Sequence, residues 1–416
     1  MNAPDSKHIL ILGAGHAGGV AAHALRQAGF AGKVTLVGAE THPPYERPPL
    51  SKELLAGASP VEKTYLRPLA FYADAGITLR LGETALAIDR KAQRVSLSSG
   101  ETIPYDALLL TLGARARRLP VPGGGHGSVF FLRDIADSLA LQARFDEGKR
   151  LAVIGAGFIG LEAAAVARKR GLAVTVLEMQ REPIQRVAAP EIGHFLAELH
   201  RGNGVDLRTG VGASAIEDTG KDLRLPLSSG ERSTGETLAA DFVLVGIGAQ
   251  PNTELAREAG LAVEDGVVVD EFGRTNDPAI YAAGDVTKHW NPLLKRRIRL
   301  ESWQNAQNQA ISVAKAMAGG TQPFAEIPWF WTDQYDVNLQ MAGAPESWDS
   351  LVWRGNPPEK SFTVFYMKDG KPVAVNTVNN GRDMRFAREL VAQGRKIDPV
   401  RLADKTVKLQ DLARES

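Results

Sequence analysis

A strand–turn–helix motif occurs twice in this chain, and the repeat constrains the fold more than any other feature. Residues 8–18 read HILILGAGHAG and residues 151–160 read LAVIGAGFIG, so each copy leads from an apolar run into three glycines at GxGxxG spacing. The glycines are Gly13, Gly15, Gly18, Gly155, Gly157 and Gly160. Such glycines permit a tight turn, the close approach of a pyrophosphate to the helix N-terminus, and close packing of helix on strand.

An acidic residue follows each copy where dinucleotide-binding proteins hold a ribose. The apolar segment 33–38 leads to Glu40, and the segment 173–177 leads to Glu178. A carboxylate about 20 residues after the glycines can accept hydrogen bonds from ribose hydroxyls. Because one protein seldom needs two nicotinamides, we expect FAD at the first site and a nicotinamide dinucleotide at the second. Glu178 would repel the 2′-phosphate of NADP and so favours NAD, although the nearby Arg181 weakens that preference.

The composition excludes several kinds of chemistry. The chain has no cysteine, so it can form no disulfide, thiolate nucleophile or cysteine-ligated iron–sulfur cluster, and we predict no metal site. Redox chemistry must then depend on bound cofactors. The net charge is +1 without a long block of like charge, which argues against nucleic acid or a membrane surface as partner. No signal-peptide pattern is present at the N-terminus, and a cytoplasmic location is the expectation.

The order of the motifs predicts an α/β protein of three domains. A short apolar strand at residues 280–283 runs into Gly284 and Asp285, and a helix is expected from about Ser302. These features indicate that an FAD-binding domain resumes after a nicotinamide domain. We expect residues 1–115 and 247–322 in the FAD-binding domain and residues 116–246 in the NAD-binding domain. Alternating segments around the turn KDGK predict a small antiparallel sheet with helices in residues 323–416.

Three further groups of residues have both a functional and a structural interpretation. A proline-rich loop at residues 41–51 lies beside the presumed pyrophosphate. Arg47 lies in this loop and Lys52 just after it, where they contact the cofactor or belong to a simple connector. Asp285 would bind the sugar-alcohol chain of a flavin dinucleotide, or is an ordinary turn residue. Trp331 would stand between the flavin and a partner, or is a core aromatic residue.

Several segments together make the chain similar to the ferredoxin reductases of oxygenase systems. They are PYERPPLSK (44–52), GAGFIGLE (155–162), EMQREPIQRVAAPE (178–191), IYAAGDV (280–286), ESWQNAQNQ (301–309), PWFWTDQYD (328–336) and NNGRD (379–383). The resemblance implies a glutathione-reductase-type flavoprotein fold with two Rossmann-like dinucleotide-binding domains. It also implies FAD as cofactor, NADH as electron donor and a separate [2Fe–2S] ferredoxin as acceptor, which would serve a Rieske-type dioxygenase or a cytochrome P450.

The same resemblance implies roles for individual residues. Glu40 would contact the adenosine ribose of FAD, Arg47 and Lys52 the FAD, Asp285 its ribityl chain, Trp303 the isoalloxazine and Glu178 the NAD ribose. Lys52 and Glu162 would form an ion pair against the flavin, as the catalytic pair. Thr332 stands where the family pattern has serine, and it keeps the hydroxyl.

A cationic segment is the expected docking site for the ferredoxin. Residues 288–299 hold five cations in a chain of nearly balanced charge, and Lys295, Arg296 and Arg297 are the candidates together with Trp331. A cationic rim would steer an acidic ferredoxin, whereas the structural alternative is a solvated loop.

Two alternative functions share the expected architecture. A quinone reductase would need an amphipathic membrane helix, for which the C-terminal segment is too charged. A redox-sensing protein resembling apoptosis-inducing factor is the non-catalytic alternative. Disulfide reductases are excluded by the absence of cysteine.

Overall fold

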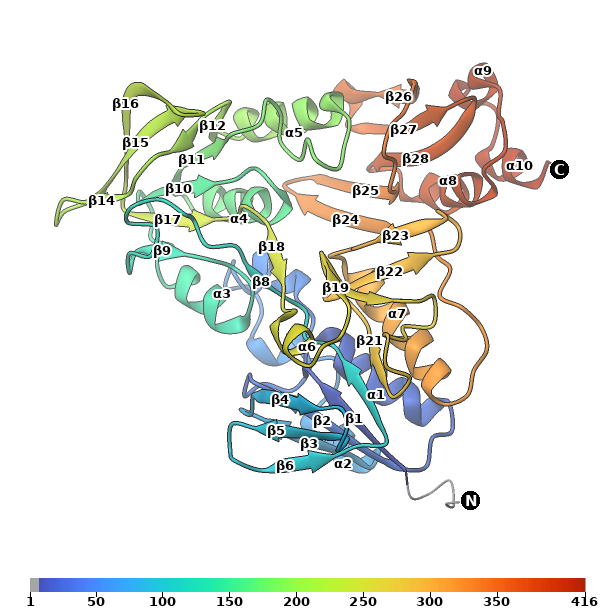
Figure 1. Ribbon diagram of the computed structural model, residues 1–416. Coiled ribbons are helices and arrows are strands. Elements are labelled where there is room, and N and C mark those ends of the chain that lie inside the picture. Colours follow the sequence, from blue (N-terminus) through green and yellow to red (C-terminus); the bar gives the residue numbers. More distant parts are fainter. Residues whose placement is uncertain (1–6, 416) are drawn as a thin grey trace.

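A five-stranded parallel sheet contains the first glycine motif. Figure 1 shows the computed structural model, which describes residues 7–415. The strand order is β21-β7-β1-β2-β3, so a strand from late in the chain closes one edge of a sheet built by its beginning. The strands are β1 (His8–Leu12), β2 (Lys33–Gly38), β3 (Ile77–Leu81), β7 (Ala107–Leu110) and β21 (Ile280–Ala282). The predicted return of the chain to this sheet at residues 280–283 is confirmed.

Both faces of this sheet are covered, as continuous apolar strands require. Ile9 and Ile11 point to α1 (His16–Gln27) and α7 (Trp303–Met317), whereas Leu10 and Leu12 point to the opposite layer. Short strands and α6 (Glu254–Glu258) form that opposite layer. Its strands are β4 (Ala85–Asp89), β5 (Arg94–Leu97), β6 (Thr102–Pro104), β19 (Val263–Glu264), β20 (Gly266–Val269), β22 (Thr287–Asn291) and β23 (Arg296–Ile298). The short helix α2 (Leu69–Asp74) packs beside β3.

A second five-stranded parallel sheet contains the second glycine motif. Its order is β12-β11-β10-β17-β9, which repeats the arrangement of the first sheet with the motif strand at the centre. Helices α4 (Phe158–Lys169) and α5 (Pro190–Gly202) cover one face, α3 (Ile135–Gln142) packs beside β9, and an antiparallel sheet covers the other face. The parallel strands are β9 (Val129–Phe130), β10 (Arg150–Ile154), β11 (Ala173–Glu178), β12 (Asp206–Thr209) and β17 (Phe242–Val245). The antiparallel strands are β13 (Gly212–Ala213), β14 (Glu217–Asp218), β15 (Leu223–Ser229) and β16 (Arg232–Ala240).

The chain passes between the two parallel sheets along one paired connection. Strands β8 (Ala114–Ala116) and β18 (Ala249–Pro251) pair antiparallel, so the outgoing and returning segments lie side by side (Figure 1). Inserting a second unit there leaves the first sheet intact, because its missing edge strand is supplied after the return.

An antiparallel sheet with helices forms the C-terminal part, as the sequence predicts. The order is β24-β25-β28-β27-β26, and the KDGK segment makes the β27–β28 hairpin turn, where Asp369 and Gly370 have positive φ. The strands are β24 (Trp329–Gln334), β25 (Val337–Gly343), β26 (Ser350–Asn356), β27 (Ser361–Lys368) and β28 (Lys371–Val378). The helices are α8 (Gly381–Gln393), α9 (Pro399–Ala403) and α10 (Leu409–Arg414).

One apolar core joins the three parts. Leu50 and Leu54, next to the proline-rich loop, belong to the same cluster as Leu161 of α4 and Phe362 of β27. This loop contains the 3₁₀ turn Pro48–Ser51, and two further 3₁₀ turns occur at Val61–Thr64 and Pro357–Glu359. Within residues 7–415, none of the helices has the length and apolar character needed to cross a membrane.

Candidate active site

A cavity of about 700 Å³ lies at the carboxyl ends of the first sheet and extends to the second glycine motif. Gly13 and Gly15 line one end, and Phe158, Ile159 and Glu162 of α4 line another part of its wall. The carboxyl edge is where parallel α/β sheets bind ligands. The first turns of α4 therefore adjoin the same space as the first glycine motif, whereas Gly155, Gly157, Gly160 and Glu178 lie outside its lining.

The glycines of each motif have two separate structural roles. Gly13 and Gly155 have φ of 109° and 104°, and a Cβ there would lie 2.2 Å and 2.5 Å from a backbone oxygen, so the turn itself requires glycine. Gly15 and Gly157 have ordinary negative φ, and a Cβ would lie no closer than 3.8 Å and 3.6 Å to any protein atom. The protein alone would accept alanine at Gly15 and Gly157. The open space beside the two helix N-termini fits a pyrophosphate.

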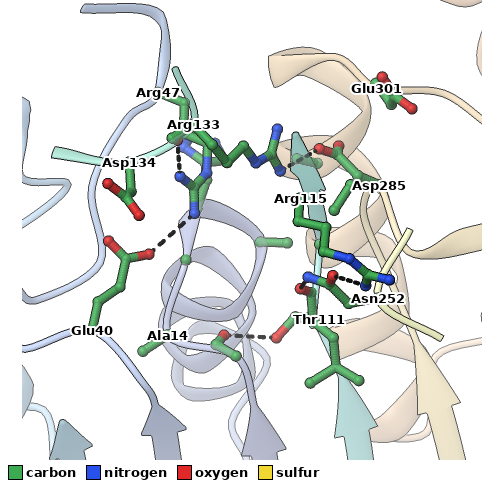
Figure 2. Close-up of a pocket in the computed structure, with 18 of the residues that line it drawn as sticks. Ala14, Glu40, Arg47, Thr111, Arg115, Arg133, Asp134, Asn252, Asp285 and Glu301 are labelled. Atoms are coloured by element: carbon green, nitrogen blue, oxygen red, sulfur yellow. Dashed lines mark hydrogen bonds and ion pairs between the residues drawn. The ribbon is translucent and has the colours of Figure 1, made fainter. Parts of the chain in front are cut away.

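Glu40 is held by two side chains from the proline-rich loop. The Tyr45 hydroxyl donates to Glu40 Oε2 at 2.5 Å, and Arg47 Nη2 pairs with Glu40 Oε1 at 3.3 Å (Figure 2). Burial raises the pKa of Tyr45, which keeps its phenol protonated as a donor. Glu40 and Arg47 both line the cavity, so the carboxylate is oriented before any ribose binds.

A second arginine links the proline-rich loop to the resumed part of the first unit. Arg133 Nη2 pairs with Asp285 Oδ2 at 2.9 Å, and Arg47 donates to the Arg133 carbonyl. Figure 2 shows Arg47 between Glu40 and Arg133, with Arg133 extending toward Asp285. Each guanidinium is neutralised by one carboxylate, so the two arginines offer a pyrophosphate N–H donors rather than net positive charge. The structure thus brings Glu40, Arg47 and Asp285 together through a residue that sequence reasoning missed.

His16 is a buried residue of the cavity wall whose polar atoms have no partner. It follows Gly15 at the start of α1, is 7% exposed, and neither ring nitrogen has a hydrogen-bond partner within residues 7–415. Burial lowers its pKa to about 4, so the ring is neutral at pH 7. Its ring lies 5.3 Å from that of Trp303, at the start of α7. A buried polar group aimed into a cavity without a partner fits a ligand that supplies one.

Lys52 and Glu162 form the predicted ion pair. Lys52 Nζ lies 3.0 Å from Glu162 Oε1, and both residues line the cavity. Glu162 is 3% exposed and also accepts from Ser51 Oγ at 2.5 Å and Thr332 Oγ1 at 2.6 Å. The pair joins the proline-rich loop to α4, where the two units meet. Its contact with a flavin stays a prediction.

Glu178 ends β11, beside the second glycine motif. Its carboxylate accepts from the backbone N–H of Ala156 at 2.7 Å and from that of Gln180 at 2.8 Å. These bonds orient the carboxylate at the open end of the strand. Ile159 and Met179 nearby are 42% and 66% exposed, so this side of the second unit is accessible to solvent. That arrangement fits a ligand that enters and leaves.

Three tryptophans lie in one group at the cavity mouth. The Trp303 and Trp331 rings are 5.8 Å apart, and Trp331 stacks on Trp329 at 5.1 Å. Trp303 and Trp331 line the cavity, and both are half-buried. Trp331 thus lines the cavity and is partly open to solvent, as a position between the flavin and a partner requires, and its role stays a prediction.

The cationic segment 288–299 forms the β22–β23 hairpin, and most of its charges are paired. Arg296 pairs with Glu346 at 3.2 Å and donates to the Ala344 carbonyl at 2.5 Å, which attaches the hairpin to the C-terminal part. Lys288 and Arg299 are also ion-paired. Within residues 7–415, Lys295 and Arg297 form no ion pair, and both are exposed. The local excess of free positive charge is therefore smaller than the sequence suggests.

Sequence reasoning missed a further group at the cavity. Arg115 donates to Asn252 Oδ1 at 2.9 Å and pairs with Glu254 at 2.6 Å, across the β8–β18 connection. All three residues line the cavity. Asn252 and Glu254 lie more than a hundred positions from Arg115 in sequence and belong to no motif. Only the pairing of β8 with β18 reveals the group.

The fold holds two glycine motifs of the dinucleotide-binding type on two parallel sheets, and the helix of the second motif adjoins the cavity of the first. The family model for pyridine nucleotide-disulphide oxidoreductases matches residues 7–310, and that for the reductase C-terminal domain matches residues 329–413. The chain therefore belongs to the pyridine nucleotide-disulphide oxidoreductase family, whose ferredoxin reductases use FAD and NAD(P)H.

Individual relatives agree with this assignment. The chain is 42% identical over 411 residues to the ferredoxin–NAD(+) reductase component of the anthranilate 1,2-dioxygenase system of Burkholderia cepacia, covering 96% of this chain and 98% of that one. It is similar to the crystal structure of the ferredoxin reductase for the CYP199A2 system of Rhodopseudomonas palustris, with a TM-score of 0.94, 39% identity and coverage of 98% and 100%. The covalent putidaredoxin reductase–putidaredoxin complex gives a TM-score of 0.93 at 37% identity, with 98% of each chain covered. The predicted family and fold class are confirmed.

Proposed function

We propose that this protein is an NADH:ferredoxin reductase that passes electrons to a separate [2Fe–2S] ferredoxin serving a Rieske-type dioxygenase or a cytochrome P450. The observation that carries the proposal is the shared cavity wall: the Lys52–Glu162 pair joins α4 of the second unit to the proline-rich loop of the first, in the cavity that Gly13 and Gly15 also line. The relatives named above are reductase components of such systems. The cytoplasm is the location we propose.

We assign the predicted residues to two cofactor sites. Gly13 forms the turn of the FAD site, Gly15 leaves space for the pyrophosphate, Gly18 lets α1 pack against the turn, and Gly284 precedes Asp285. Glu40, Arg47, Asp285 and Trp303 contact FAD. Gly155, Gly157, Gly160 and Glu178 hold NADH. We place the domain boundaries at residues 1–115 with 247–322, at 116–246 and at 323–416, in agreement with the β8–β18 connection.

Bound FAD would supply the conversion of the two electrons of NADH into the single electrons that a [2Fe–2S] cluster requires. The chain's own groups supply charge and shape. The Lys52 ammonium lies at the cavity wall, where it would stabilise negative charge gained on reduction. Phe158 and Phe330, with ring centroids 4.3 Å apart, line the wall beside it and restrict water.

The ferredoxin would dock near Trp331 and the β22–β23 hairpin. The structure modifies the proposed set of Lys295, Arg296, Arg297 and Trp331, because Arg296 already neutralises Glu346. Lys295 and Arg297 are the exposed cations that remain available to an acidic partner.

The test is NADH-driven reduction of purified [2Fe–2S] ferredoxins by the holoprotein, followed by the visible spectrum of the cluster. A ferredoxin should be reduced faster than a water-soluble quinone at equal concentration. Faster quinone reduction would favour a quinone reductase. Slow flavin turnover with every acceptor would favour a redox-sensing protein.

A further inference from the structure

A chain of buried polar side chains extends from the Lys52–Glu162 pair into the protein. Thr332 donates to Glu162 Oε1 at 2.6 Å, Gln334 Nε2 donates to Thr332 Oγ1 at 3.1 Å, and His200 Nε2 lies 2.9 Å from Gln334 Oε1. Thr332 and Gln334 are 1% exposed and His200 is 0% exposed. The chain thus connects the cavity wall to β24 and then to α5.

The direction of every bond in this chain is determined by Glu162. A carboxylate paired with Lys52 has no proton, so the hydroxyl of Thr332 must donate to it. Thr332 has then used its only proton and must accept from the amide of Gln334. The Gln334 oxygen therefore accepts, and His200 must carry a proton on Nε2. Burial lowers the pKa of His200 to about 4, in agreement with a neutral ring at pH 7.

Packing alone does not explain this chain of buried polar side chains. An apolar cluster of similar volume would stabilise the same core at least as well as buried polar groups do. Thr332, Gln334 and His200 do not line the cavity, yet all their donors point toward the ion pair that does. Glu162 also accepts from Ser51, so the chain completes a set of donors around a single buried carboxylate.

We propose that Thr332, Gln334 and His200 are positioning residues that fix the Glu162 carboxylate and, through it, direct the Lys52 ammonium toward the flavin. This inference rests on the proposed FAD site. Loss of the Thr332 donor leaves more uncompensated negative charge on Glu162 beside the cofactor. Reduction of the flavin, which adds negative charge, then becomes less favourable.

The first test compares Thr332→Val with Thr332→Ser in the purified holoprotein. The flavin is titrated against a reference redox dye, without NADH or ferredoxin. We expect the equilibrium constant for flavin reduction to fall about fivefold in Thr332→Val, the effect of one buried hydrogen bond, and to return to the wild-type value in Thr332→Ser.

A matched control separates this effect from simple destabilisation. Thr363 on β27 is fully buried and donates to another carboxylate, Asp383, at 3.2 Å. Thr363→Val should lower the melting temperature without changing the flavin equilibrium. An unchanged equilibrium in folded, FAD-loaded Thr332→Val would overturn the proposal, as would an equal change in Thr363→Val.

A second measurement is made on the wild-type protein and needs a variant only to assign the signals. In ¹⁵N-histidine-labelled wild-type holoprotein at pH 7, His200 should show a protonated Nε2 and an unprotonated Nδ1. The signals are assigned by their loss in His200→Gln. A ring protonated only on Nδ1 would contradict the bond direction argued above, and a charged ring would contradict the neutral state expected from burial. Neither test uses ferredoxin, so failure of the proposed acceptor would leave both results valid.

Discussion

The two glycine motifs build nearly the same local structure, and their surroundings differ. In the first, Glu40 is held by Tyr45 and Arg47, and the adjoining cavity is lined by segments from both ends of the unit. In the second, the hydrogen-bond donors to Glu178 within residues 7–415 are backbone N–H groups, and exposed Ile159 and Met179 lie beside it. We infer that the first site retains its dinucleotide and the second exchanges it. The motifs themselves are alike, so the difference comes from the side chains and loops around them, which surround the first site more completely than the second.

The largest expected effects come from matched substitutions at the two open glycines. Gly15→Ala should weaken FAD binding about 100-fold and yield colourless protein, since its methyl would occupy pyrophosphate space and displace the ligand. Gly157→Ala should keep the yellow FAD and raise the KM for NADH by a similar factor. Flavin absorbance after gel filtration and steady-state kinetics measure the two effects. If Gly157→Ala also loses FAD, the assignment of the two sites is wrong.

The second prediction concerns the ribose carboxylate of the exchanging site. Glu178→Ala should lower kcat/KM for NADH about 30-fold, the effect of losing about 2 kcal/mol of charge-assisted hydrogen bonds. NADPH should lose much less, because its 2′-phosphate is no longer repelled. Comparing both donors with ferricyanide as acceptor checks this. Equal use of NADH and NADPH by the wild type would contradict the role of Glu178.

Acid should destabilise both regions, because His16 and His289 of the first and His200 of the second are buried histidines whose pKa is lowered to about 4. Within residues 7–415, the ring nitrogens of His289 have no hydrogen-bond partner, so His289 tests the effect of burial alone. Burial lowers the pKa of His289 to about 4, so between pH 6.5 and 4 the unfolded chain binds a proton that the folded chain does not. Stability is therefore lost as the pH falls, by roughly 2 kcal/mol at pH 5 for this group.

His289→Phe should remove that part of the acid sensitivity. The melting temperature of the variant should fall less than that of the wild type between pH 7.5 and pH 5. The exposed His194 provides the control, since His194→Phe should leave the difference unchanged. An equal loss in His289→Phe and wild type would show that this buried ring does not control acid stability.

The fourth prediction makes the first motif more like the second. His16 occupies the position that Phe158 has in the second copy. His16→Phe should weaken FAD binding about tenfold, because the cofactor loses a hydrogen-bond partner that the cavity otherwise leaves unsatisfied. His23→Phe, on the same helix but away from the cavity lining, should bind FAD normally. Flavin fluorescence titration of the apoproteins gives both affinities.

Local pattern predicted what depends on neighbouring residues in sequence. The glycine spacing, the acids after the second strands and the alternating C-terminal segments were sufficient for the two parallel sheets and the antiparallel sheet. The Lys52–Glu162 pair followed from a family resemblance, and the structure contains it.

The missed contacts have one physical property in common. Arg133 meets Asp285 across 152 positions, and Thr332 meets Glu162 across 170. Neither pair has a spacing that a helix or strand period could reveal, because each depends on how separate units pack. Ion pairs likewise changed the interpretation of the cationic segment. Their acidic partners Glu264, Asp265 and Glu346 lie outside it in sequence.

The smallest expected effect concerns the exposed cation of the β22–β23 hairpin. Because Arg296 supports the hairpin through Glu346 and Ala344, replacing it would confuse docking with local structure. Arg297 is exposed, and within residues 7–415 it forms no ion pair, so Arg297→Glu tests charge alone. We expect ferredoxin reduction to slow about threefold at low ionic strength and less at high salt, since screening weakens steering.

Two controls make that small effect interpretable. Ferricyanide reduction should not change, because a small acceptor does not need the docking surface. Arg232→Glu alters an exposed arginine on β16, in the second unit, by the same charge and should leave ferredoxin reduction at the wild-type rate. If Arg232→Glu slows the ferredoxin as much as Arg297→Glu, only overall charge matters. The docking site must then be sought around Trp331, where the closed site of the first motif reaches the surface.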